Sequence, residues 1–95
     1  MLIVSKLPDD VFNENVSIEN LEEISLGDDE TGEGGTNYEE IVELMGNPPN
    51  NRAEYQENGS TIVEADWRRD NEGNEFISVN FIDGMAVGKF QEGLK

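Results

Sequence analysis

A short helix with clear signals at both ends, within residues 34–50, constrains the fold of this chain more than any other feature. Thr36 can serve as its N-cap, and Glu39 three residues later can reach back to the N–H of that cap. Gly46 stands where a left-handed C-terminal cap belongs, and the two prolines that follow stop the helix. One helix face is apolar and carries Tyr38, Ile41, Val42 and Met45. A helix this short needs a surface to pack against.

That surface is predicted in the second half of the chain, where apolar residues alternate and indicate strands over 61–69, 75–82 and 85–91. Asp83-Gly84 signals a two-residue type I′ turn between the last two strands. With this turn, Val79 opposes Gly88 and Ile77 opposes Phe90, while Trp67 opposes Ile77 across a loop at 70–74. The predicted core face comprises Val63, Ala65, Trp67, Ile77, Val79, Phe81, Ala86, Gly88 and Phe90.

Asn58-Gly59 marks a further turn, for which the sequence allows two lengths. A two-residue hairpin would place Glu54 opposite Val63, on the core side. A three-residue loop, Asn58-Gly59-Ser60, would instead place Tyr55 opposite Val63, with a bulge at the turn. We expect the second register because it keeps an acidic side chain out of the core.

The first half of the chain is acidic and less regular. Residues 2–7 are apolar and fit either a short strand or a disordered tail. Ser17 is a good N-cap for a short helix over 18–24, and a glycine-rich acidic loop at 28–35 joins the two helices. We therefore expect a flexible or strand-like extension at 1–16 and a single domain at 17–95. The predicted fold is α+β, with two short helices packed on one face of a three- to four-stranded antiparallel meander.

The opposite face of the predicted sheet mixes polar with apolar side chains. It carries Ile62, Glu64, Asp66, Arg68, Phe76, Ser78, Asn80, Ile82, Met85, Val87, Lys89 and Gln91. Such a face is either solvated, partly covered by residues 2–7, or a protein-contact surface. For the last case, the candidate protein-binding residues are Ile62, Arg68, Phe76, Ile82, Met85, Val87 and Lys89.

Composition excludes several functional classes. Twenty-two acidic residues against six basic ones give a formal charge of −16, which disfavours nucleic acid and anionic membranes as partners. The chain has no histidine, which removes the commonest general base, and no cysteine, which removes thiol catalysis and disulfides. No apolar run is long enough to span a membrane. We expect no cofactor and no enzymatic activity.

The acidic motifs do not match known ion or phosphate sites. Asp28, Asp29, Glu30 and Glu33 are hard oxygen ligands that could attract calcium, but they lack the spacing of an EF-hand loop. Residues 70–75 fail the same template because the first ligand position is Arg68. Gly32, Gly34 and Gly35 are not preceded by a strand or followed by a lysine, so they do not form a phosphate-binding loop. We therefore predict no specific metal site.

Residues 18–94 resemble the domain repeat of β-lactamase inhibitor proteins, and most closely related uncharacterised lipoprotein domains of Gram-positive bacteria. The resemblance is carried by Ile24-Ser25-Leu26-Gly27, Gly34-Gly35-Thr36, Tyr38-Glu39-Glu40-Ile41-Val42, Leu44-Met45-Gly46-Asn47-Pro48, Ala65-Asp66-Trp67, Ile77-Ser78-Val79-Asn80-Phe81, Asp83-Gly84 and Gly93-Leu94. It implies a helix–loop–helix packed on an antiparallel sheet, the architecture of small outer-membrane assembly lipoproteins as well. Members are exported, are often lipid-anchored, and act by binding other proteins. The related inhibitors do so through the sheet surface away from the helices.

These features predict a non-enzymatic protein-binding module of an exported or envelope-associated bacterial protein, as a monomer or weak dimer. Its partner would be another protein, and the domain itself would not insert into a membrane. The alternative is a cytoplasmic or phage-borne acidic domain that binds a partner or a cation without an envelope role. An export signal ahead of residue 1 would decide between these compartments.

Overall fold

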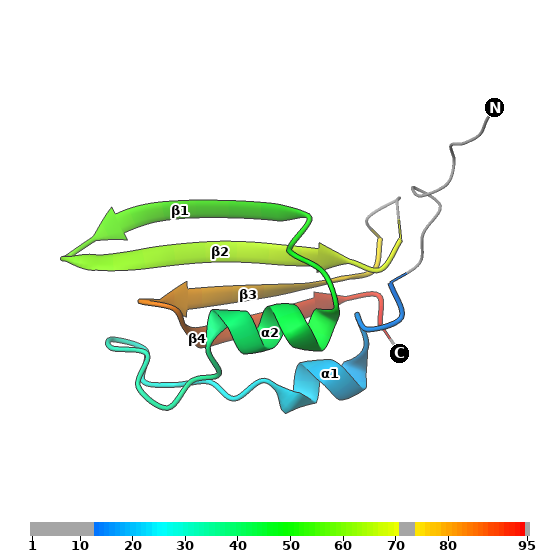
Figure 1. The fold of residues 1–95 in the computed structure, drawn as a ribbon, viewed down its shortest axis with the longest axis horizontal. Coiled ribbons are helices and arrows are strands. Elements are labelled where there is room, and N and C mark those ends of the chain that lie inside the picture. The colour runs from blue at the N-terminus through cyan, green and yellow to red at the C-terminus, as the bar shows by residue number, and fades with distance from the viewer. Residues whose placement is uncertain (1–12, 71–73, 95) are drawn as a thin grey trace.

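The structure, a computed structural model, describes residues 13–70 and 74–94 and shows two helices on one face of a sheet (Figure 1). The elements are α1 (Ile18–Glu23), α2 (Tyr38–Met45), β1 (Asn51–Glu57), β2 (Ser60–Arg68), β3 (Phe76–Ile82) and β4 (Met85–Glu92). All neighbouring strands are antiparallel, and the sheet order is β1-β2-β3-β4. The predicted α+β fold is therefore confirmed, with four strands in the meander. The expected strand at 2–7 lies outside the described residues.

Helix α2 begins one residue later than its sequence signals indicate. Its N-cap is Asn37, whose side chain accepts a hydrogen bond from the N–H of Glu40 at 2.9 Å. The expected cap, Thr36, is wrong because its hydroxyl oxygen instead accepts the N–H of Ser25 at 2.8 Å. This bond ties the chain just after α1 to the start of α2. The C-terminal cap is as predicted, since Gly46 is left-handed with φ 78°.

Helix α1 is capped at both ends by side chains. Ser17 accepts the N–H of Asn20 at 3.2 Å, as its position before the helix predicts. At the other end, the ammonium group of Lys89 donates to the carbonyl oxygens of Leu21 at 3.0 Å and Ile24 at 2.8 Å. A cation at this end is favourable because the last carbonyls of a helix carry partial negative charge. This contact ties α1 to β4.

The core lies between the sheet and the helices. Its buried residues are Val16, Ile24, Ile41, Met45, Val63, Ala65, Trp67, Ile77, Val79, Phe81, Ala86 and Leu94. Trp67 is fully buried, as predicted, and its indole N–H donates to the carbonyl oxygen of Asn47 at 2.8 Å. This bond satisfies the one polar group of the ring and fixes the segment after α2 against β2.

The domain extends a few residues before the expected start at residue 17. Val16 is completely buried in the core, and the N–H of Asn13 donates to the carbonyl oxygen of Arg69 at 2.8 Å. The side-chain amides of Asn13 and Asn15 both donate to the carbonyl oxygen of Met45, at the end of α2. Residues 13–16 therefore pack with the domain rather than with the extension in which the sequence placed them.

The register of β2 against β3 is the predicted one, but β4 departs from its prediction. Trp67 opposes Ile77 and Ala65 opposes Val79. Between β3 and β4 a bulge leaves Val87 without a partner, because Ala86 opposes Phe81 while Gly88 opposes Asn80.

This extra residue reverses the parity of β4, so two residues expected on the core face were wrongly placed there. Phe90 opposes Ser78 and is 56% exposed, and Gly88 also lies on the side away from the helices. Lys89 and Gln91 were expected on that side, yet Lys89 opposes Val79 and Gln91 opposes Ile77, on the helix side.

The register of β1 is the one that the sequence analysis set aside. Asn58 and Gly59 form a two-residue turn with positive φ values of 54° and 85°, so Glu54 opposes Val63 and Tyr55 opposes Ile62. The expected three-residue loop is wrong. Strand β1 does not cover the core, because every one of its residues is exposed, so the acidic side chain of Glu54 stays solvated on the helix side.

The acidic loop at 28–35 is ordered against the β3–β4 hairpin. The Asp28 carboxylate accepts the backbone N–H groups of Glu30 and Thr31 and the Thr31 hydroxyl, and these bonds hold the pKa of Asp28 below its ordinary value. On either side of the loop, the N–H of Gly27 donates to the carbonyl of Ala86 and the N–H of Ala86 donates to the carbonyl of Thr36. The loop is thus held between α1, α2 and β4.

Raising the salt concentration is expected to raise the melting temperature. Repulsion among carboxylates opposes the compact state at a formal charge of −16, although Arg52–Glu54 and Arg69–Glu75 ion pairs offset part of it. Salt at ~0.5 M screens this repulsion over a distance of a few ångströms. Thermal unfolding followed by circular dichroism in sodium chloride measures the shift. An unchanged or lower melting temperature would show that the acidic groups are already compensated.

Candidate protein-contact surface

The sheet face away from the helices, here called the outer face, is the surface that the sequence analysis put forward. Both helices lie on the other face in the part of the chain that the structure describes (Figure 1). Alternation along the strands and the observed registers assign the outer face. Its residues include Ala53, Tyr55, Ile62, Glu64, Asp66, Arg68, Phe76, Ser78, Asn80, Ile82, Met85, Gly88 and Phe90.

One end of the outer face carries an aromatic pair. The rings of Phe76 on β3 and Phe90 on β4 lie with their centroids 6.1 Å apart and their planes tilted by 50°. Phe76 is half-buried, Phe90 is 56% exposed, and Arg68 opposes Phe76 from β2. The pair is held by neighbouring strands, and it exposes apolar area next to a cationic side chain.

The other end of the outer face is less accessible than its apolar residues suggest. Ile82 is only 8% exposed, and Met85 is half-buried. The backbone of Gly32 lies so close that an added Cβ would stand 2.8 Å from the Ile82 carbonyl oxygen and 2.9 Å from the Met85 Cβ. The acidic loop therefore covers this end.

The centre of the outer face is polar. A hollow there is lined by small or polar side chains of β1, β2 and β3: Asn51, Ala53, Glu64, Asp66, Ser78 and Asn80. Asp66 Oδ1 is buried and accepts no hydrogen bond from the described residues. The hydroxyl of Tyr55 donates to Glu64 at 3.1 Å, and this bond raises the pKa of Tyr55. The centre thus offers hydrogen-bond acceptors, whereas the Phe76–Phe90 end offers apolar area.

The structure brings together five of the seven candidate binding residues on the outer face: Ile62, Arg68, Phe76, Ile82 and Met85. The other two were misplaced. Val87 occupies the bulge of β4, and Lys89 lies on the helix side, where it binds the carbonyls at the end of α1. Lys89 is therefore not part of the candidate contact surface on the outer face.

Two exposed aromatic residues of the outer face were missed by the sequence analysis. Phe90 was expected in the core because no sequence signal marked the bulge at Val87. Tyr55, which is 44% exposed, was expected opposite Val63 because the longer turn was preferred. The Asn-Gly pair was the signal that could have placed Tyr55 correctly.

The described residues hold neither a cluster of metal ligands nor a membrane-spanning helix. Across residues 13–70 and 74–94, no group of three or more aspartate or glutamate side chains is arranged to hold a metal ion. The same described ranges contain no helix long and apolar enough to cross a membrane. What the surface offers is a partly exposed aromatic pair, a neighbouring guanidinium group and a set of hydrogen-bond acceptors.

The described residues form a small α+β domain whose two helices lie on one face of the sheet, while the acidic loop reaches only one end of the outer face. No family model matches the chain, and it matches no curated protein and no solved structure. The resemblance to β-lactamase inhibitor domains therefore stays a prediction, and the function is argued from the surface itself.

Proposed function

We propose that this domain is a non-enzymatic protein-binding module whose contact surface is the Phe76–Phe90 end of the outer face. The observation that supports the proposal is the aromatic pair on neighbouring strands, with Phe76 half-buried, Phe90 more than half exposed and Arg68 opposite Phe76. A few residues carry most of the binding energy of a protein interface, and aromatic and arginine side chains are enriched at the centres of interfaces. Surrounding polar groups then form the rim that an interface needs.

The position of both rings on paired strands supports the proposal that they form the contact surface. Phe76 projects from the inner strand β3 and Phe90 from the edge strand β4, which are hydrogen-bonded to each other, so neither ring is carried by a loop. A partner would therefore bind two rings that are already positioned, and it would lose little conformational entropy in ordering them. The acceptors at the centre of the face, Glu64 and Asp66 among them, favour a partner that brings N–H or cationic donors.

The compartment follows only from the family resemblance, which points to an exported or envelope-associated protein. The alternative is a cytoplasmic or phage-borne domain with the same contact surface. An antibody against the domain, applied to fractionated cells of the producing organism, distinguishes the two. Signal in the envelope or medium is expected, and signal confined to the cytoplasm would contradict the envelope assignment.

Replacing Phe76 or Phe90 by alanine is expected to weaken binding of the partner by about 1–2 kcal/mol each. The partner is first captured by a photoreactive amino acid at position 90, and its affinity is then measured by calorimetry. Leu26→Ala is the matched control. Leu26 is also an exposed apolar residue, at 46%, but it belongs to the chain segment that links α1 to α2 and not to the outer face.

The control variant is expected to bind as the unmodified domain does. Unfolding curves should show that Phe90→Ala stays folded, since most of that ring is already in water. Equal crosslinking from position 90 and from Glu22, an exposed residue of α1, would contradict a specific outer-face contact. Unchanged affinity in both phenylalanine variants would also reject the proposal.

A further inference from the structure

The β1 edge lies apart from the outer face and has features of its own. Figure 1 shows the β1–β2 ribbon above the helices, which cover the β3 and β4 half of the sheet. Every residue of β1 is exposed, and no proline or bulge interrupts the strand from Asn51 to Glu57. An uninterrupted edge strand offers unpaired backbone groups to which another strand can bind.

The two-residue turn determines which backbone groups point outward. Glu57 and Ser60 flank the turn and form a hydrogen-bonded pair, and such pairs alternate along an antiparallel ladder. Ala53 and Tyr55 therefore direct their N–H and C=O groups toward β2. The backbone groups of Arg52, Glu54 and Gln56 point to the outer edge of β1, with which no other described strand pairs. This alternation defines three places where an added strand would pair.

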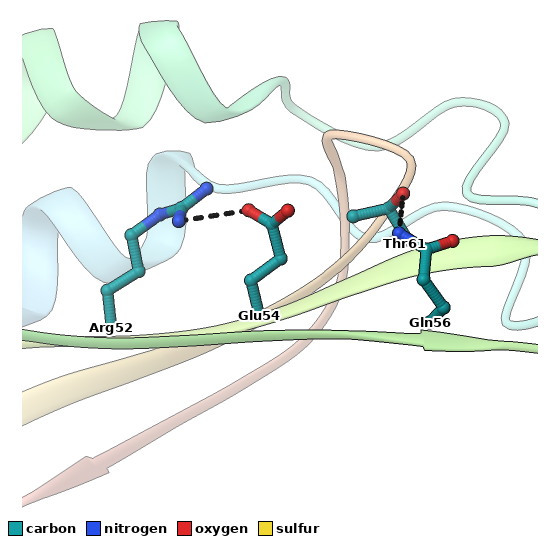
Figure 2. Close-up of polar contacts among 4 residues, drawn as sticks. All are labelled: Arg52, Glu54, Gln56 and Thr61. Atoms are coloured by element: carbon teal, nitrogen blue, oxygen red, sulfur yellow. Dashed lines mark hydrogen bonds and ion pairs between the residues drawn. The ribbon is translucent and has the colours of Figure 1, made fainter.

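The side chains of the same three residues face the helix side of the sheet. In Figure 2, Arg52, Glu54 and Gln56 all project from β1 toward that side, where Gln56 donates to the Thr61 hydroxyl at 2.8 Å. A groove lies there between β1, β2 and the first turn of α2. Val63 and Phe81 form an apolar floor, and both are buried.

The rim of this groove is acidic, and its wall is aromatic. Glu39, Glu54 and Asp83 line it, and the ring of Tyr38 packs edge-on against Phe81 with centroids 5.2 Å apart. Carboxylates around an aromatic ring are the surroundings that a cationic side chain prefers, because the ring face and the carboxylates both attract positive charge.

One cationic side chain already occupies the groove. The guanidinium carbon of Arg52 lies 5.2 Å from the centroid of the Tyr38 ring, and its Nη1 lies 3.0 Å from Glu54 Oε1. Both side chains of the ion pair are more than 40% exposed, so water screens the attraction and the contact is weak. Arg52 thus shows which chemistry the groove accepts, and it can be displaced at small cost.

From these observations we infer that the β1 edge and the groove beside α2 together bind an extended basic segment of another protein. The segment adds to the free edge of β1 as a fifth strand, and one of its arginine side chains replaces Arg52 against Tyr38 and Glu54. Main-chain hydrogen bonds to positions 52, 54 and 56 supply affinity, and the acidic groove supplies selectivity for positive charge. A second copy of the chain is disfavoured as occupant because each copy carries a formal charge of −16.

The test uses the full chain, labelled with ¹⁵N, and a short synthetic peptide with capped ends in which arginine alternates with valine and threonine. Hydrogen exchange is measured amide by amide, with and without the peptide. Strand addition predicts slower exchange at Arg52, Glu54 and Gln56, and little change at Ala53 and Tyr55, which already bond to β2. A peptide with a central proline, which lacks an N–H to donate, and one with glutamate in place of arginine should both fail to protect these amides.

Two variants separate the groove from general charge attraction. Glu54→Lys is expected to weaken peptide binding roughly tenfold, because it reverses the charge at the groove. Glu43→Lys is the matched control, since it makes the same charge change on the exposed side of α2, away from the groove, and should have a much smaller effect.

A third variant, Arg52→Gln, tests the displacement of the resident cation. It should strengthen peptide binding roughly two- to five-fold by removing the competing guanidinium group.

Several outcomes would overturn the inference. Equal losses in Glu54→Lys and Glu43→Lys would mean nonspecific attraction to an acidic protein. Amide protection that misses positions 52, 54 and 56, or shifts confined to Phe76 and Phe90, would exclude strand addition at β1. Protection of the same amides without peptide, increasing with protein concentration, would assign the edge to a second copy instead. Unfolding curves of each variant confirm that the comparison is made on folded protein.

Discussion

Replacing Trp67 by alanine is expected to lower the free energy of unfolding by about 3–5 kcal/mol. The side chain is fully buried between the sheet and the helices, so its removal leaves a cavity at the centre of the core. It also removes the donor to the carbonyl oxygen of Asn47, which then loses its partner. Since small domains are stable by about 5–15 kcal/mol, the variant would be close to unfolding.

Urea unfolding followed by far-ultraviolet circular dichroism measures this loss. Tyr55→Ala is the control, because Tyr55 is an aromatic residue that is 44% exposed, and its change should stay within about 1 kcal/mol. Trp67→Phe should fall between the two variants, since it fills most of the cavity but cannot donate to Asn47. A Trp67→Ala protein that unfolds at the same urea concentration as the unmodified chain would contradict the core described here.

The parts of the fold that could be predicted are those in which local and long-range signals agree. Helix α2 combines an apolar face with Gly46 and the prolines that follow, and each signal marks the same boundary. Buried and more exposed residues alternate along most of β2 and β3. Only one pairing register places the buried residues of both strands on the same face of the sheet. The burial of Trp67 could be predicted from that alternation alone.

The errors arose where the core does not constrain the chain. Strand β1 is exposed throughout, so burying apolar residues was the wrong criterion, and the local preference of Asn58-Gly59 determined the register instead. Thr36 and Asn37 are both able to cap α2, and only the tertiary contact from Ser25 to Thr36 distinguishes them. These choices depend on turn chemistry and on neighbours that are distant in sequence.

The bulge at Val87 had the largest consequence for the candidate surface. It moved Phe90 onto the outer face and Lys89 to the end of α1, and neither change has a signal in the alternating pattern. Ile62, Arg68 and Phe76 lie before the bulge, and their predicted side of the sheet is correct. Residues on a surface can therefore be assigned from sequence only as far as the register is uninterrupted.

Gly35→Ala is expected to lower the free energy of unfolding by about 2–3 kcal/mol. A Cβ at Gly35 would stand 2.2 Å from the carbonyl oxygen of Ala86, and the atom it meets is backbone, which cannot move aside easily. Relief requires the chain before α2 to separate from β4. That movement would break the bonds by which Gly27 donates to Ala86 and Ala86 donates to Thr36, at 2.8 and 2.9 Å.

Gly88→Ala is the matched control and also tests the register of β4. A Cβ at Gly88 would meet Asn80 at 3.5 Å or more, an ordinary contact on the outer face, so we expect a change within about 1 kcal/mol, in the stabilising direction. Had β4 continued without a bulge, Gly88 would lie under the helices beside Val79. The added methyl group would then clash with the packed core and destabilise the fold. Urea unfolding of both variants therefore gives one clear contrast. A destabilised Gly88→Ala would reject the bulge, and a stable Gly35→Ala would reject the close approach of the loop to β4.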